Sequence, residues 1–257
     1  MGHQREKLIS LAKRLLNHNL NGSTDQADQI MIKKVNDYID DDIISSEVSK
    51  IFYDHPVPIA LSAELKKKNS YKSTKAIDTP LLITRDENGV VRTFINICKH
   101  RGAPVCPEGR GEKSKFNCTY HGWMYDNKGS LINIFKSDTF GDINTKNIKL
   151  TELFCEEKSG FIWACLNPDI KYNLSDWMNE FESELDDIGL KNWYIFKSTT
   201  INGPRWKICW DGYLDGYHHH MVHPETVGKN TIVNLIAHDT YAVSYTHLRA
   251  HETKANL

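Results

Sequence analysis

Two short segments of the chain combine Cys and His at spacings that suit metal ligands. "CKHRG" at residues 98–102 and "CTYHGW" at residues 118–123 contribute one Cys and one His each. Thiolate and imidazole together suit either tetrahedral zinc or a [2Fe–2S] cluster. Each pair follows a strand-like run and precedes a Gly, so we expect two loops at the tips of neighbouring hairpins. The candidate ligands are Cys98, His100, Cys118 and His121.

The order of these ligands favours the cluster over zinc. Zinc fingers usually place Cys with Cys and His with His along the chain, whereas each loop here supplies one of each. Both Cys can then hold one iron and both His the other. The plainer alternative is that two packed Cys and two surface His fell into register by chance. The adjoining Gly102, Gly122 and Trp123 disfavour that alternative.

A further segment, "LDGYHHHMVHPE" at residues 214–225, places four histidines within six positions. On a regular helix, residues four apart share a face, which selects His219 and His223 as a ligand pair. Pro224 weakens that choice because it disfavours the helical conformation at His223. Spacing alone leaves the pair undecided, and an exposed His cluster without metal remains the alternative.

Together these segments resemble the two metal motifs of Rieske non-heme iron oxygenases. Cys-x-His-Arg-Gly and Cys-x-Tyr-His-Gly-Trp are the forms of the Rieske motif in that family, and the resemblance implies a [2Fe–2S] cluster on the four ligands named above. "DGYLDGYHHHMVHP" is similar to the family's iron motif, Asp/Glu-x3-Asp-x2-His-x4-His. This likeness implies a mononuclear non-heme Fe(II) on His218 and His223, with His219 and His220 in variable positions.

The same resemblance implies roles for two carboxylates. Asp215 would be the inter-subunit electron bridge, joining His218 to His121 of a neighbouring chain in a ring-shaped homotrimer. Asp211 would support the iron-binding helix.

The third iron ligand in the family is an Asp much further along the chain than His223. The acids that follow His223 here are Glu225, Asp239 and Glu252, of which Asp239 is a conceivable local substitute. Residues 244–257, "SYTHLRAHETKANL", resemble a foreign read-through tail. We therefore expect a C-terminally truncated α (catalytic) subunit whose third carboxylate ligand is missing and which is inactive alone.

The function implied is that of a Rieske-type oxygenase subunit. Electrons from NAD(P)H would pass through a partner reductase, in some relatives also a ferredoxin, to the cluster and then to the iron, which activates O2 to hydroxylate a small organic, aromatic substrate. Some relatives add a β subunit. A Rieske ferredoxin-like electron carrier is the alternative, and it would need only the first pair of segments. A zinc-stabilised module is the third.

The elements that must position these residues follow from hydrophobic patterning. Residues 6–20 have helical spacing, and the runs 80–97 and 122–134 each read as two strands joined by a Gly-containing turn. Residues 160–166 read as a buried strand, and residues 174–190 as an amphipathic helix capped by Ser175 or Asp176.

The predicted fold class is α+β. We expect an N-terminal helical segment over residues 1–45 and an antiparallel β Rieske [2Fe–2S] domain over 46–168. The start of a helix-on-sheet (α/β) mononuclear iron catalytic domain would occupy residues 169–257.

Composition limits the partners. The chain has 257 residues with 32 basic and 33 acidic side chains, so no charge pattern indicates a nucleic-acid or membrane partner. The sequence shows no signal peptide and no run of 18 apolar residues, from which we expect a cytoplasmic protein.

Overall fold

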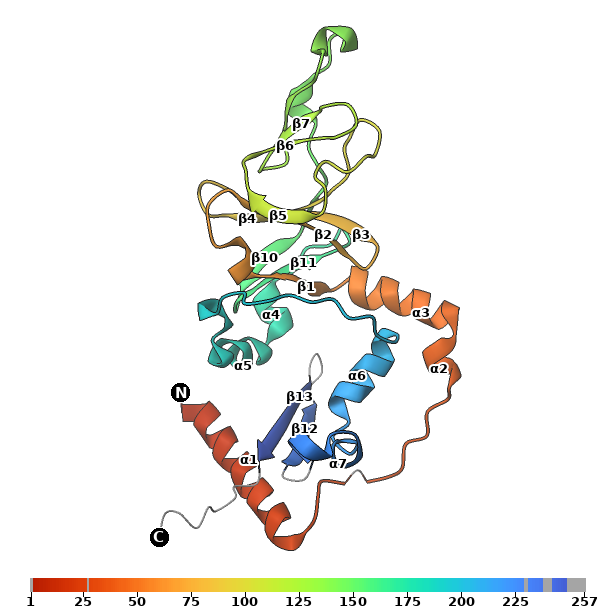
Figure 1. The fold of residues 1–257 in the computed structure, drawn as a ribbon, viewed down its shortest axis with the longest axis vertical. Helices are drawn as coiled ribbons and strands as arrows, with labels where there is room; N and C mark the ends of the chain where they lie inside the picture. Colours follow the sequence, from red (N-terminus) through yellow and green to blue (C-terminus); the bar gives the residue numbers. More distant parts are fainter. Residues whose placement is uncertain (1, 27, 229–230, 238–241, 249–257) are drawn as a thin grey trace. The chain divides into compact units, whose positions relative to one another are not determined.

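The computed structural model describes the backbone of residues 2–26, 28–228, 231–237 and 242–248. Packing divides the chain into two compact units. Residues 41–199 form one, called here the β unit, and residues 1–40 with 200–257 form the other, called the terminal unit. Figure 1 draws the helices and strands of both, and each unit is described by itself.

Three antiparallel sheets form the β unit. Their strand orders are β5-β2-β3-β4-β9, β1-β11-β10 and β6-β7-β8. The strands are β1 Pro56–Leu61, β2 Ser70–Ala76, β3 Thr79–Arg85, β4 Val91–Ile95, β5 Gly109–Glu112, β6 Lys115–Asn117, β7 Met124–Asp126, β8 Leu131–Asn133, β9 Glu152–Leu153, β10 Cys155–Lys158 and β11 Phe161–Cys165. Every strand pair is antiparallel, which confirms the predicted sheet type.

Strand β3 shows how alternation along a strand builds the core. Leu81 and Ile83 point to one face, into an apolar cluster shared with β11. Leu82 points to the other face, into a second cluster that also contains Cys98 and Cys118. All three aliphatic side chains are fully buried, and burial of each contributes about 1.5–3 kcal/mol to folding. The candidate cluster ligands therefore lie at the edge of a packed core.

Both predicted hairpins form, and their turns are built alike. In the β3–β4 turn, the carboxylate of Asp86 accepts the N–H groups of Asn88 and Val90, each at 2.9 Å. In the β7–β8 turn, Asp126 accepts the N–H groups of Lys128 and Ser130 at 2.9 and 2.8 Å. A short acidic side chain thus replaces the missing backbone partners of each turn.

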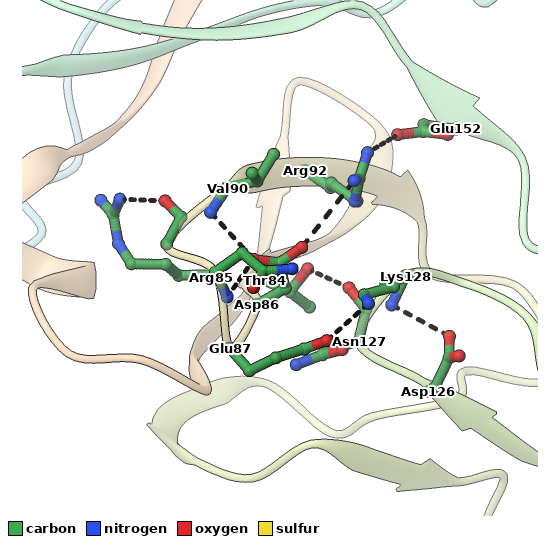
Figure 2. A network of polar contacts seen from close by, with 12 residues as sticks. Thr84, Arg85, Asp86, Glu87, Val90, Arg92, Asp126, Asn127, Lys128 and Glu152 are labelled. Atoms are coloured by element: carbon green, nitrogen blue, oxygen red, sulfur yellow. Dashed lines mark hydrogen bonds and ion pairs between the residues drawn. The ribbon is translucent and has the colours of Figure 1, made fainter.

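These two turns are joined to one another (Figure 2). Thr84 Oγ1 donates to the carbonyl of Asn127 at 2.7 Å, and Lys128 pairs with Glu87 at 2.5 Å. Thr84 is fully buried, so its hydrogen bond is shielded from water. The hairpin that follows the second candidate loop is therefore held against the hairpin that precedes the first.

Helices border the sheets of the β unit. They are α3 Asp41–Glu47, the π-helix Val48–Tyr53, α4 Leu174–Met178 and α5 Phe181–Ile188, together with short 3-10 helices at Ser62–Leu65, Ser137–Phe140, Thr145–Asn147 and Leu190–Asn192. The single helix predicted over residues 174–190 is wrong: Asn179, at φ 48°, separates two short helices. Asn173 caps the first by accepting the N–H of Asp176, so the cap lies before both residues named from the sequence.

The terminal unit begins with α1, Gly2–Asn21, which confirms the helix predicted over residues 6–20. Leu11 and Leu15 form its buried stripe. Gly22, at φ 60°, ends it. The described residues between 22 and 35 form no helix, and the next helix is α2, Asn36–Ile39.

Later elements of the terminal unit are short. They are α6 Trp206–Leu214, α7 His219–Val222, the π-helix Pro224–Gly228, and the antiparallel pair β12 Thr231–Ala237 and β13 Ala242–Leu248. No helix within the described ranges of either unit is long and apolar enough to cross a membrane.

Candidate metal centres

The two candidate loops of the β unit have the same backbone geometry. In the first loop, which follows β4, the N–H of Cys98 donates to Ala103 O at 2.8 Å and Gly102 N–H donates to Cys98 O at 3.0 Å. In the second, between β6 and β7, Cys118 N–H donates to Trp123 O at 2.9 Å and Gly122 N–H to Cys118 O at 3.0 Å.

Each loop therefore closes on its own Cys. The two glycines have φ values of 74° and 68°, a conformation that side chains rarely adopt, so both positions require Gly.

The side chain of Asn96 holds the first loop in place through four hydrogen bonds. Its side-chain oxygen accepts the N–H groups of Val105 and Cys106, each at 3.0 Å. Its amide donates to Cys106 O at 2.7 Å and to Ser73 Oγ at 3.0 Å. A buried amide with all of these bonds made fixes the loop against β2.

The structure brings the two Cys together on the buried side of the loops. Cys98 and Cys118 are 3% and 4% exposed and belong to one apolar cluster. Burial is the main cause that raises the pKa of the Cys98 thiol, and the neighbouring Cys118 raises it further. Without a bound cation the raised pKa keeps the Cys98 thiol protonated at neutral pH, whereas a bound metal would ionise the thiols that ligate it.

Tyr125, on β7, is the polar neighbour of this pair. Its hydroxyl accepts the N–H of Lys99 at 3.1 Å and lies 3.4 Å from Cys98 Sγ. With the Lys99 N–H occupying one lone pair, the hydroxyl hydrogen is available to the sulfur.

The two His lie together on the outer side of the loops. The rings of His100 and His121 have centroids 4.6 Å apart. Nδ1 of His100 is buried and has no hydrogen-bond partner among the described residues. Burial lowers the pKa of His100, which favours the neutral imidazole that binds metal.

These four side chains therefore stand as two pairs, Cys beside Cys and His beside His. No group of three or more His, Cys, Asp or Glu among the described residues is arranged to hold a single metal ion. A tetrahedral zinc site needs four ligands around one point, whereas a Rieske cluster spreads its ligands as two pairs over two irons. The buried thiols and the unpartnered imidazole nitrogen fit a [2Fe–2S] group.

The second candidate site belongs to the terminal unit. Helix α6 ends at Leu214, and Asp215 follows it in an extended conformation. The carboxylate of Asp215 accepts the N–H of Tyr217 at 2.8 Å and lies 3.4 Å from Nδ1 of His218. A carboxylate on Nδ1 orients the imidazole and leaves Nε2 for a metal.

The four histidines here have different positions. His218 precedes α7, and His223 lies directly after it with φ −125°, outside the helix as the following proline predicts. Their ring centroids are 5.6 Å apart, and both line an open cavity of about 720 Å³. His219 also lines this cavity, whereas His220 is exposed and does not.

Of the remaining predicted residues, some lie in the described part of the chain and others do not. Asp211, on α6, accepts a hydrogen bond from the hydroxyl of Tyr38 at 2.6 Å, so its carboxylate ties α6 to α2. Asp239 and Glu252 lie outside the described residues, as do residues 249–257 of the predicted foreign tail. His218 and His223 therefore have no third ligand within the part of the chain described.

Sequence reasoning missed three contributors to these sites: Asn96, Tyr125 and Phe140, whose ring lies 5.7 Å from the ring of His100. Tyr125 could have been suspected from its place two residues after Trp123 in a strand that leaves the loop. Asn96 and Phe140 carry no such signal: Asn96 lies outside both motifs, and Phe140 contacts His100 from a segment far along the chain.

Comparisons with known proteins agree with the geometry. The model of the family described as Rieske [2Fe-2S] domain matches residues 55–146, which include all four candidate cluster ligands. The chain is 29% identical over 180 residues to the anthranilate 1,2-dioxygenase large subunit of Burkholderia cepacia, covering 64% of this chain and 41% of that one. It is 30% identical over 189 residues to the chloroplastic choline monooxygenase of Beta vulgaris, covering 71% and 42%.

Solved structures show the same fold. A quaternary ammonium Rieske monooxygenase in complex with an inhibitor superposes with a TM-score of 0.75 at 24% identity, covering 83% of this chain and 61% of that one. The chain thus spans about two fifths of the length of the two sequence relatives above.

Proposed function

The chain belongs to the family of Rieske non-heme iron oxygenase α subunits, and from that premise we propose that it delivers electrons from a [2Fe–2S] cluster to a mononuclear iron for oxygenation of a small organic substrate. The observation that carries the proposal is the double pairing at the two loops, where Cys98 lies by Cys118 and His100 by His121. The whole protein would be an oxidoreductase that incorporates O2.

We assign the cluster to the β unit. Cys98 and Cys118 would hold one iron, and His100 and His121 the other. The cluster, once bound, supplies reversible one-electron transfer. The protein orients the two imidazoles, excludes water from the two sulfurs, and places the Tyr125 hydroxyl beside Cys98.

We assign the mononuclear iron to His218 and His223. The Fe(II), when bound, supplies the site at which O2 is activated. Asp215 would hold Nδ1 of His218, and Tyr217 N–H in turn fixes the Asp215 carboxylate. In the proposed assembly, Asp215 also bridges to His121 of a neighbouring copy, and Asp211 supports α6 through Tyr38. The third ligand would be a carboxylate outside the described residues.

Substrate and partners belong to the same proposal. We propose an aromatic substrate, electrons from NAD(P)H through a reductase with or without a ferredoxin, and a homotrimer with or without a β subunit. The large-subunit name of the anthranilate relative supports the multi-subunit arrangement, and the choline relative shows that the family also includes a monooxygenase for a non-aromatic compound. The boundaries 45/46 and 168/169 remain our proposed domain limits.

A cluster test separates this function from a zinc module. The chain, purified with iron and sulfide, should be red-brown, contain equal iron and acid-labile sulfide, and give a Rieske-type EPR signal after reduction. Cys118→Ala should lose the colour and the signal.

Cys106→Ala is the matched control, because Cys106 is a buried thiol close to the first loop but outside the motif, and it should keep both. A colourless protein that contains zinc and no labile sulfide would overturn the assignment.

A further inference from the structure

Two aromatic rings from outside the ligand set, those of Trp123 and Phe140, pack against one of the candidate cluster ligands, His100. The indole of Trp123 lies parallel to the imidazole of His100, with centroids 4.9 Å apart and an angle of 7° between the planes. The ring of Phe140 meets both of them edge-on, at 5.7 Å from His100 and 5.8 Å from Trp123. Such offset and edge-to-face pairs are attractive beyond their buried area.

Phe140 reaches this position from a segment outside the three sheets. After β8 the chain enters a short 3-10 helix, Ser137–Phe140, drawn in green in Figure 1. Lys136 at φ 52° leads into it and Gly141 at φ 64° leads out. These two turns direct the last residue of the helix back onto the first loop. The side chain of Phe140 is 37% exposed, so it forms the outer wall of the enclosure.

The orientation of His100 needs an explanation, because ligand imidazoles are usually oriented by a hydrogen bond at their second nitrogen. Within the described part of the chain, the ring of His100 accepts and donates no hydrogen bond, and its Nδ1 is buried without a partner. Besides the neighbouring imidazole of His121, the Trp123 face and the Phe140 edge are the described ring contacts that restrict rotation of this ring. Aromatic packing therefore orients the His100 imidazole, as the Asp215 carboxylate orients the imidazole of His218.

We propose that Phe140 is a positioning residue for the cluster: with Trp123 it clamps the His100 imidazole, directs Nδ1 at the iron and shields that side of the cluster from water. This inference rests on the proposed cluster site. It concerns a residue outside both ligand segments, contributed by the excursion that follows β8.

The other histidine is enclosed less completely. His121 has the ring of Tyr120 beside it at 3.8 Å, and Tyr120 is 61% exposed. Among the described residues, His100 thus has two aromatic neighbours from outside the ligand set and His121 has one, which is itself exposed.

Opening the clamp should raise the reduction potential. A [2Fe–2S] core with two thiolates is neutral when oxidised and carries one negative charge when reduced, so added water stabilises the reduced form. For Phe140→Ala we expect the equilibrium constant for reduction to rise about three- to tenfold, which is roughly 30–60 mV for one electron. We also expect broader EPR lines, because the His100 ring becomes free to take several orientations.

The experiment compares four proteins reconstituted with the cluster: wild type, Phe140→Ala, Phe140→Tyr and Ile143→Ala. Midpoint potentials are measured at one pH, together with EPR of the reduced state. Phe140→Tyr keeps the ring and should match the wild type in both. Ile143 is the control, since it lies three residues further along and is also 37% exposed. Its removal should change neither quantity.

The outcomes separate the two proposals. If the wild type assembles no cluster, the proposed function fails. If the wild type shows the Rieske signal but Phe140→Ala has an unchanged potential and linewidth, the clamp is refuted and the cluster assignment stands. A shift of the same size in Ile143→Ala would likewise refute the clamp, because it would show a general effect of loosening the segment.

Discussion

The four histidines of residues 218–223 lie within six positions of one another but have different surroundings. His218 is oriented by Asp215, His223 lies beyond the helix, and both border the cavity. His219 borders it too, with a buried Nδ1 that has no described partner and a pKa lowered chiefly by burial. His220 is exposed to solvent. Of these four, His218 is the one whose ring is hydrogen-bonded to a carboxylate of the described residues.

The family motif selects His218 and His223 as the iron ligands, and the carboxylate beside His218 supports that choice. His218→Ala and His223→Ala should each lose mononuclear Fe(II), while the cluster absorbance is unchanged. Asp215→Asn, which removes only the orienting charge, should weaken Fe(II) binding by about 10–100-fold. The measurement is Fe(II) affinity by competition with a chelator.

His220→Ala is the control for that series, and His219→Ala should also retain the metal. Loss of iron in the His219 variant together with retention in the His218 variant would show that the ligand pair is His219 with His223.

At the scale of elements, the two candidate cluster loops resemble each other, and so do the turns of the two hairpins beside them. Each loop places Gly four residues after its Cys, and each supporting hairpin has Asp three residues before its Gly. Gly89 and Gly129 hold these turn positions, at φ 88° and 79°. Their surroundings differ: a Cβ on Gly129 would lie 2.5 Å from the buried ring of Phe94, whereas a Cβ on Gly89 would meet nothing within 4 Å.

The two glycines therefore form a matched pair for a stability measurement. Both Gly→Ala changes impose the same left-handed backbone, which costs about 1–2 kcal/mol. Gly129→Ala should cost about 1–3 kcal/mol more, because the β7–β8 turn must move away from Phe94. Urea unfolding of the two variants checks this, and equal midpoints would show that the turn yields without strain.

At the scale of the whole molecule, the two candidate centres belong to different packing units, so the proposed reaction would require an electron to pass from one unit to the other. Cys98, His100, Cys118 and His121 lie in the β unit, whereas His218 and His223 lie in the terminal unit. The family resemblance places the crossing between copies, from His121 of one chain to Asp215 of the next. The alternative is a crossing within one chain.

Mixing two defective variants distinguishes these routes. Cys118→Ala lacks a cluster and His223→Ala lacks the iron, so neither alone should reoxidise a reduced cluster at the iron when O2 is added. In mixed assemblies, transfer between copies should restore reoxidation to about a quarter to a third of the wild-type rate, as expected for random mixing in a homotrimer.

Rapid-scan absorbance at the cluster bands follows the reaction. Mixtures that stay as inactive as the separate variants, although an affinity tag on one variant co-purifies the other, would demonstrate transfer within one chain.

The sequence by itself determined the ligand types, their order and the hairpins that carry them. These features are local: alternation with period two sets each strand, and an Asp three residues before a Gly sets each supporting turn. It also predicted that His223 leaves the helix, because Pro224 acts on its immediate neighbour. The helix over residues 174–190 was wrong because the turn at Asn179 interrupts a pattern whose periodicity is otherwise helical.

The order of the motifs already predicted that Cys pairs with Cys and His with His, and only the tertiary structure decided what surrounds these pairs. The two thiols lie in one buried core, Asn96 bonds to Ser73 of β2, and Phe140 closes over His100. Each of these contacts joins residues more than 15 positions apart, and composition and spacing carry no record of them. They arise because packing the shared core at high density leaves few arrangements of the loops above it.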